Sequence, residues 1–138
     1  MKITGIAALL LRLALASGFL SAVASRLNLW GKQSSGWSNF LHYTAQVNSF
    51  VPQSFIPGIA VTSTILETAL GILLFVGFKT SYVAYGAALL SLLFALAMTY
   101  SFGIKEPMDY SVFTFCAGAF LLATIPSHKW SIDQLLTN

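Results

Sequence analysis

The sequence contains very little charge. Only 8% of its 138 residues are charged, seven Lys or Arg and four Asp or Glu, whereas 57% are hydrophobic. A soluble domain carries about 25% charged residues, so these few charges cannot cover the surface of a soluble globule. The composition excludes a disordered chain, a nucleic-acid-binding module and an ordinary soluble enzyme. It predicts an integral membrane protein whose surroundings are a lipid bilayer, with no nucleic-acid partner.

Cysteine and histidine are also scarce. A single cysteine, Cys116, can form neither an internal disulfide nor a paired-cysteine redox motif. The two histidines, His42 and His128, lack the spacing of metal ligands, and no phosphate loop or nucleophile elbow is present. We therefore expect no metal and no covalently bound cofactor, and the sequence identifies no catalytic residue.

Long apolar segments dominate the chain instead. A transmembrane helix needs about 20 apolar residues, and neighbours joined by short connections must be antiparallel. The sequence thus predicts one domain, residues 1–138, with an all-α fold: an integral membrane four-helix up-down bundle. The expected spans are residues 5–25, 55–78, 82–102 and 108–125, followed by a polar tail, residues 126–138.

The first apolar segment allows a second interpretation. Lys2 gives it a basic start, and residues 22–24 resemble a small-x-small cleavage site, as in a secretory signal peptide. Against this, Arg12 interrupts the apolar region, and the segment is long enough to span a membrane. We favour a first transmembrane helix.

Residues 26–54 separate the first two expected spans and differ in composition. Within them, residues 37–48 are amphipathic, since polar and apolar side chains fall on opposite sides at 100° per residue. Tryptophan and tyrosine, which favour the membrane interface, are frequent here. We expect a short interfacial helix between the first and second spans, with its polar face toward water. That face consists of Ser38, Asn39, His42 and Gln46.

Two charges fall inside expected spans, Arg12 in the first and Glu67 in the second. A charge in hydrocarbon costs about 2.5–3.5 kcal/mol, so such residues usually face the interior and find a partner. We expect an Arg12–Glu67 ion pair. The pair would bind a polar head group such as a quinone carbonyl, relay a proton, or simply fix helix registry. Residues expected near a pocket at this pair are Ser63, Thr64, Gly71, His42 and Tyr43.

Four spans place both termini on the same side of the membrane. Lysine and arginine are usually in excess on the cytoplasmic side. Here Lys2, Lys79 and Lys129 lie on the side of the termini, and Arg26, Lys32 and Lys105 lie opposite, so the count is tied. We expect cytoplasmic termini.

Three short motifs resemble the DoxX-like family (DoxX and DoxD) of small bacterial four-helix membrane proteins. They are Leu-Leu-Arg-Leu at 10–13 with Gly-Phe at 18–19, Glu67 with the apolar run at 70–77, and Pro-Met-Asp-Tyr-Ser-Val-Phe at 107–113. The resemblance covers most of the chain. It implies a multi-pass protein of the bacterial inner membrane that associates with quinone-linked oxidoreductases.

Three functional hypotheses follow. The chain is a subunit or accessory protein of a quinone-linked membrane oxidoreductase, with a polar pocket open to lipid for a quinone and with a partner subunit. Alternatively it is a small-solute or proton transporter. The third is a structural membrane protein that stabilises a partner without catalysis. The bundle interior should discriminate among them. An oxidoreductase subunit needs a tunnel to the lipid, a transporter needs a water path through the bundle, and a structural protein needs neither.

Overall fold

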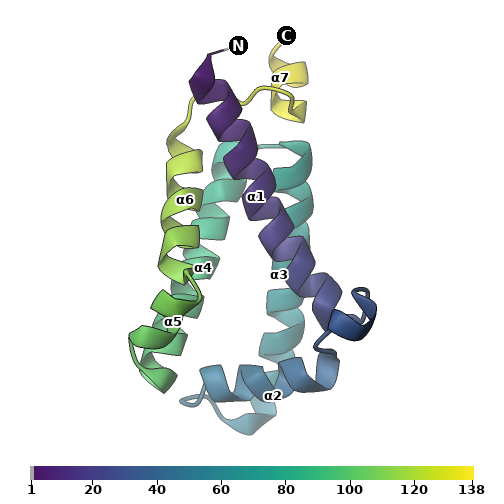
Figure 1. Cartoon of the computed structure of the whole chain (residues 1–138), viewed down its shortest axis with the longest axis vertical. Helices are drawn as coiled ribbons and strands as arrows, with labels where there is room; N and C mark the ends of the chain where they lie inside the picture. The colour runs from purple at the N-terminus through teal and green to yellow at the C-terminus, as the bar shows by residue number, and fades with distance from the viewer. Residues whose placement is uncertain (1) are drawn as a thin grey trace.

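The chain is all-helical in a computed structural model that describes residues 2–138 (Figure 1). Its α-helices are α1 (Ile3–Arg26), α2 (Trp37–Val47), α3 (Ile56–Val76), α4 (Thr80–Phe102), α5 (Lys105–Asp109), α6 (Val112–Thr124) and α7 (Ile132–Thr137). Two 3-10 turns, η1 (Gly31–Gln33) and η2 (Gln53–Phe55), precede α2 and α3. No strand occurs in this range, and the all-α prediction is confirmed.

Three helices are long and apolar enough to cross a membrane. They are α1 with 24 residues, α3 together with η2 with 24, and α4 with 23. The expected span over residues 108–125 is not a single continuous helix. Ser111 adopts a left-handed conformation, φ 57°, which interrupts the helical hydrogen-bond ladder. The chain there forms the short α5, a break at residues 110–111, and α6 with 13 residues.

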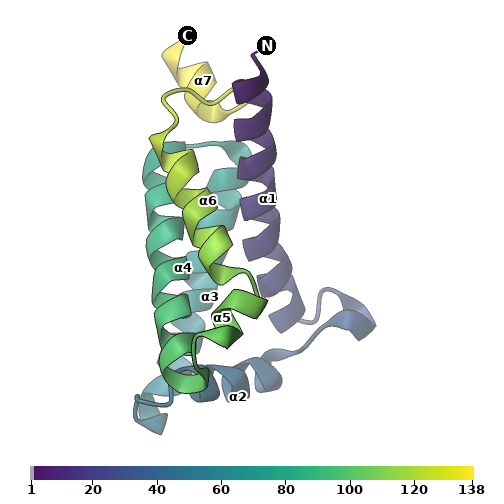
Figure 2. The ribbon, with the colours of Figure 1, turned by 60° about the vertical axis from the view of Figure 1, so that its left-hand side comes forward.

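Small residues let the long helices approach closely. α1 packs mainly on α3, and α4 packs mainly on α6; Figures 1 and 2 show these helices running along the length of the molecule, with α1 inclined to α3 in Figure 1. The interface alanines Ala16, Ala84, Ala87 and Ala119 are completely buried. Backbones can come near each other at such residues. Larger side chains, among them Leu74 and Leu122, fill the remaining core.

The helix α2 lies across one end of the molecule, and both termini lie at the other (Figure 1). Phe40, Thr44 and Val47 of α2 are buried toward the long helices. The polar side chains expected on its other face are exposed: Ser38, Asn39, His42 and Gln46. The amphipathic helix expected within residues 37–48 is therefore present.

The register of α1 against α3 determines which residues the arginines of α1 can reach. Phe19 and Leu20 lie against Gly71, and Arg12 lies against Gly77, the residue that ends α3. The nine residues of α1 before Arg12, Ile3–Leu11, therefore extend beyond the end of α3. They stand beside α7 at the end that carries the termini (Figure 2).

Candidate functional site

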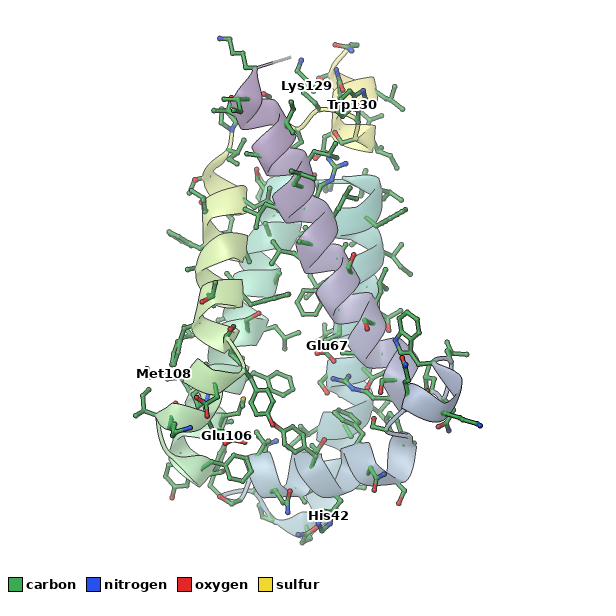
Figure 3. All side chains as sticks on the ribbon, in the orientation of Figure 1. His42, Glu67, Glu106, Met108, Lys129 and Trp130 are labelled. Atoms are coloured by element: carbon green, nitrogen blue, oxygen red, sulfur yellow. The ribbon has the colours of Figure 1, made fainter. Side chains whose placement is uncertain are left out.

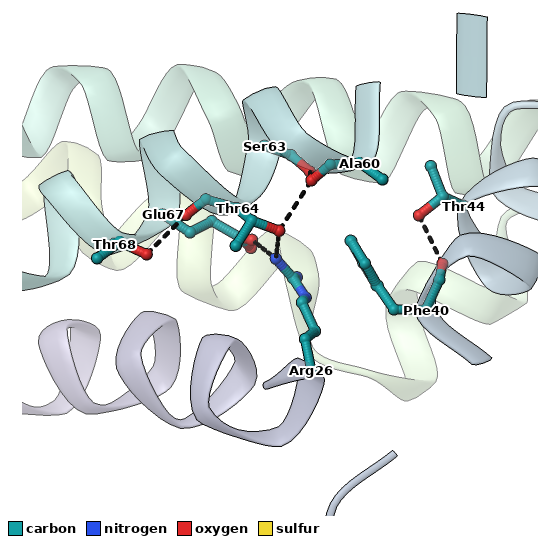
Figure 4. Close-up of polar contacts among 8 residues, drawn as sticks. All are labelled: Arg26, Phe40, Thr44, Ala60, Ser63, Thr64, Glu67 and Thr68. Atoms are coloured by element: carbon teal, nitrogen blue, oxygen red, sulfur yellow. Dashed lines mark hydrogen bonds and ion pairs between the residues drawn. The ribbon is translucent and has the colours of Figure 1, made fainter. Parts of the chain in front are cut away.

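Arg26 and Glu67 form a buried ion pair between α1 and α3. Nη1 of Arg26 donates to Oε2 of Glu67 and, at 3.1 Å, to the hydroxyl of Thr64 (Figure 4). The guanidinium carbon lies 3.7 Å from the ring centroid of Phe40, in cation–π contact. Arg26 is 7% exposed and Glu67 is 6% exposed. Three helices therefore converge on one desolvated charge pair.

The local sequence explains how each side chain reaches this position. Arg26 is the last residue of α1, where the helix dipole favours a cation. Thr64 and Glu67 are three residues apart on α3, and so lie on one face. The hydroxyl of Thr64 also donates to the carbonyl of Ala60 at 2.8 Å, which orients its oxygen as an acceptor for Arg26.

The predicted Arg12–Glu67 pair is wrong. Arg12 instead donates to the carbonyl oxygens of Lys129, at 3.2 Å, and Trp130, at 2.7 Å. Figure 3 places Glu67 in the half of the molecule nearer α2, and Lys129 and Trp130 at the opposite end. The middle of α1 is not level with the middle of α3, because α1 begins well beyond the end of α3.

Sequence reasoning assigned Arg26 to a polar connection and so missed the partner of Glu67. A signal was present, however. Arg12, Phe19 and Arg26 follow one another at intervals of seven residues and are all buried. An interval of seven keeps residues on one helix face, so the face that contains Arg12 and Phe19 also includes Arg26.

The other expected site residues are dispersed. Gly71 packs against Phe19 and Leu20 of α1, one turn beyond Glu67. Ser63 donates to the carbonyl of Ala60 at 3.2 Å and faces a different pocket. His42 and Tyr43 lie on α2 outside the pair: His42 is exposed beside Gln46, and Tyr43 stacks on Phe102. Of the set, only Thr64 binds the ion pair.

A pocket of about 310 Å³ lies beside the ion pair, lined by α1, α3, α4 and the start of α6. We call it the ion-pair pocket. Its polar lining residues are Arg26, Glu67, Ser91 and Tyr110, and its aromatic ones include Phe19, Phe94 and Phe115. Tyr110 is 66% exposed, so the pocket reaches the surface at the break between α5 and α6. This volume is at the lower end for a small-molecule site.

The break leaves backbone donors unpaired next to the ion-pair pocket. The first amides of any α-helix have no partner within the helix, and in α6 these belong to residues 112–114. No hydrogen bond from these amides to another group is found within residues 2–138. Val112 and Tyr110 both line the pocket. The site thus combines one ion pair and aromatic walls, and the start of α6, with its unpaired N–H groups, adjoins it through Val112.

A second group of charges fixes the C-terminal tail, residues 126–138, to the opposite end. Asp133 accepts hydrogen bonds from the amides of Lys79, at 2.6 Å, and Thr80, at 2.7 Å, and so caps α4. Its own amide donates to the carbonyl of Gly77 at 2.9 Å. Burial acts to raise the pKa of the Asp133 carboxyl, but the donors of Thr80 and Lys79 outweigh it and hold that pKa below its usual value.

His128 belongs to this tail and is itself buried. Neither ring nitrogen has a hydrogen-bond partner within the described residues. Burial lowers the pKa of His128; Asp133 acts to raise it and Arg12 to lower it. The neutral form is therefore favoured, and the residue contributes to packing rather than to the ion-pair pocket.

Among residues 2–138, no group of three or more His, Cys, Asp or Glu side chains is placed to hold a metal ion. The chain matches no protein-family model, no curated protein and no solved structure. The resemblance to the DoxX-like family stays a prediction from its short motifs.

Proposed function

We propose that the chain is a multi-pass protein of the bacterial cytoplasmic membrane and a subunit or accessory protein of a quinone-linked oxidoreductase. In this proposal α1, α3, α4 and the α5–α6 segment cross the bilayer as an up-down bundle, and α2 lies at the interface. The quinone ring binds in the ion-pair pocket, and a partner subunit supplies the redox centre.

The observation that carries this proposal is the buried Arg26–Glu67 pair on the wall of a pocket. An ionisable residue inside a membrane bundle is costly and commonly marks a ligand or ion pathway. Arginine has five N–H donors, and both bonds described above use Nη1. The remaining donors are suited to a quinone carbonyl, while the aromatic walls are suited to stack on its ring.

The break between α5 and α6 supports the same site. Irregular backbone at membrane depth is tolerated where it is buried in protein or lines a cavity. Here the break lies beside the ion-pair pocket, through Tyr110 and Val112. A quinone carbonyl oxygen would accept from the amides at the start of α6, which otherwise lack partners.

The ion pair also changes the topology argument. Arg26 is buried against Glu67 and is no longer a free loop cation. Three lysines then remain on the side of the termini and two on the side of α2: Lys2, Lys79 and Lys129 against Lys32 and Lys105. The positive-inside rule therefore favours cytoplasmic termini.

The test is equilibrium binding of a tail-less quinone to the purified full chain in nanodiscs. We expect saturable binding to the wild type and at least a tenfold loss in the double variant Arg26→Leu with Glu67→Leu, which removes both charges together. The matched control is Lys105→Leu with Asp109→Leu, which also removes an ion pair, but an exposed one on α5. Equal binding to wild type and the Arg26/Glu67 variant, or no binding to either, would overturn the proposal.

The alternatives give different results in the same preparation. A transporter would conduct protons or solute in sealed vesicles and lose that flux in the Arg26/Glu67 variant. A structural protein would show neither flux nor quinone binding, and would retain its partner when both charges are removed.

A further inference from the structure

We infer that a second pocket, between α3 and α4 near the end of the molecule that carries α2, holds the hydrocarbon tail of an isoprenoid quinone. This inference rests on the proposed function and defines its ligand: a neutral ring carrying a single long chain. The second pocket, the tail groove, has a volume of about 520 Å³. It is formed by α3, α4 and the end of α2, on the side of α2 that faces the long helices.

The tail groove is mainly apolar, although several hydroxyl- and amide-bearing residues line it. Thr44 donates to the carbonyl of Phe40 at 2.7 Å, Ser63 to that of Ala60 at 3.2 Å, and Asn48 to that of Thr44 at 3.0 Å. These polar groups are paired to their own helices, so they need nothing from a ligand. Thr62 adds one hydroxyl without a hydrogen bond within the described residues, and the rest of the wall is hydrocarbon and aromatic, including Val47, Phe55, Leu66, Leu90, Leu93 and Phe94.

The two pockets are adjacent. Leu90 and Phe94 of α4 line both the ion-pair pocket and the tail groove. On α3, Ser63 lines the groove, and Glu67, one turn further, lines the ion-pair pocket. A molecule with its ring at Arg26 would therefore have the groove next to it, past Phe94, as the place for its chain.

The groove also opens toward the surroundings of the bundle. Phe55 is 62% exposed and Leu93 is 55% exposed at its rim. In the proposed membrane orientation these side chains face acyl chains, so a hydrophobic ligand can enter laterally from the bilayer.

Charge decides between a quinone and a phospholipid as the occupant. The only charged residues on the walls of the two pockets are Arg26 and Glu67, which neutralise each other within the described structure. A phosphate would meet the Glu67 carboxylate with no unpaired cation beside it. A neutral carbonyl carries no such penalty, and it needs only the hydrogen-bond donors that Arg26 provides.

A single substitution at Gly58 can test the tail groove by filling it with a larger side chain. Gly58 lines the groove, and a Cβ added there would meet nothing within 4 Å. Gly58→Phe should fill the groove without disturbing the ion pair. Val61→Phe is the matched control, since Val61 is exposed on the same helix and does not line the groove. Ala97→Leu fills the groove from the opposite wall, on α4, and serves if Gly58→Phe does not fold.

The experiment compares a long-chain isoprenoid quinone with its tail-less analogue, both binding to the full chain in nanodiscs. We expect the wild type to bind the long-chain quinone at least tenfold more tightly. Gly58→Phe should abolish that advantage while leaving tail-less binding unchanged, and Val61→Phe should alter neither.

Two results would overturn the tail groove while leaving the quinone ring site intact. One is equal wild-type affinity for both quinones; the other is an unchanged advantage in both groove-filling variants. Displacement of the long-chain quinone by phosphatidylglycerol would overturn the assignment of the occupant. A wild type that binds neither quinone would instead refute the proposed function itself.

Discussion

The guanidinium of Arg12 lies where a side chain on residue 77 would have to be. A Cβ added to Gly77 would lie 2.8 Å from Nη1 of Arg12 and closer still to Cβ of Ser131. Gly77 also has φ 71°, in the left-handed region that ends α3. The first helix, the end of the third and the C-terminal tail thus meet around one glycine.

Gly77→Ala should destabilise the fold by about 3 kcal/mol or more, because it adds a steric clash to the left-handed strain of about 1–2 kcal/mol. Gly31→Ala is the matched control: Gly31 has φ 60°, and nothing lies within 4 Å of its added Cβ. Gly31→Ala should therefore lose only the stability that corresponds to the left-handed strain, about 1–2 kcal/mol. Thermal unfolding in detergent measures both, and equal losses would show that Arg12 and Ser131 move aside freely.

Arg26 and Glu67 should behave as a coupled pair. Arg26→Leu or Glu67→Leu alone leaves a buried charge without its partner and should cost about 3–5 kcal/mol. The double variant should recover much of this loss, since leucine suits an apolar environment. Unfolding free energies of the four proteins give the coupling directly.

A second double-mutant cycle, of Arg12→Leu with Glu67→Leu, provides the contrast to the Arg26–Glu67 pair. These residues have separate partners at different levels of the molecule, so their effects should add within about 0.5 kcal/mol. A strong coupling here, with none between Arg26 and Glu67, would contradict the pairing described above.

His128 should make stability depend on pH. Its pKa is lowered in the folded protein, so the unfolded chain binds more protons as the pH falls below about 6.5, the usual histidine value. The stability that neutral His128 supplies is complete above this pH and is lost progressively below it. Melting temperatures measured from pH 8 to pH 5 should therefore fall at the acid end.

His128→Leu should flatten this acid decline, whereas His42→Leu, which removes an exposed histidine, should leave it unchanged. The pKa of Asp133, which faces His128, is lowered from an ordinary value of 3.8. Its contribution is present above that pH and is lost only at still lower pH, outside the window. An undiminished decline in His128→Leu would assign the effect to another group.

Asp133→Ala should release the C-terminal tail. It removes the acceptor for two amides at the start of α4, a loss of about 2 kcal/mol for charge-assisted hydrogen bonds. Trypsin should then cleave after Lys129 faster than in the wild type. Asp109→Ala, which breaks only the exposed pair with Lys105, should leave cleavage unchanged; equal rates in all three proteins would contradict a role for Asp133.

Composition and hydropathy were sufficient to predict the all-helical fold and the amphipathic face of α2. They did not reveal the break at Ser111. A serine in the left-handed region has no distinctive neighbours, and the surrounding residues, 107–113, are compatible with a helix. Such a break is determined by how α5 and α6 pack on α4, which hydropathy does not record.

The charged site was predicted in part. The buried position of Glu67 and the participation of Thr64 followed from helical spacing, and the need for a cationic partner followed from the cost of an isolated charge. The identity of that partner did not, because it depends on the axial offset between α1 and α3. Close contacts such as Leu20 on Gly71 set the offset. A single sequence does not show which residues of α1 contact which residues of α3.

The contact of Arg12 with the tail has a consequence for biosynthesis. Arg12 and its acceptor carbonyls are 117 and 118 residues apart in the chain. A ribosome adding about 5–20 residues per second needs roughly 6–24 s to cover that distance. During this interval the cation of the first helix has neither carbonyl as a partner. Final packing of that helix must therefore wait until Trp130 has been synthesised, and chains halted before Trp130 should be open to quality-control proteases at their first helix.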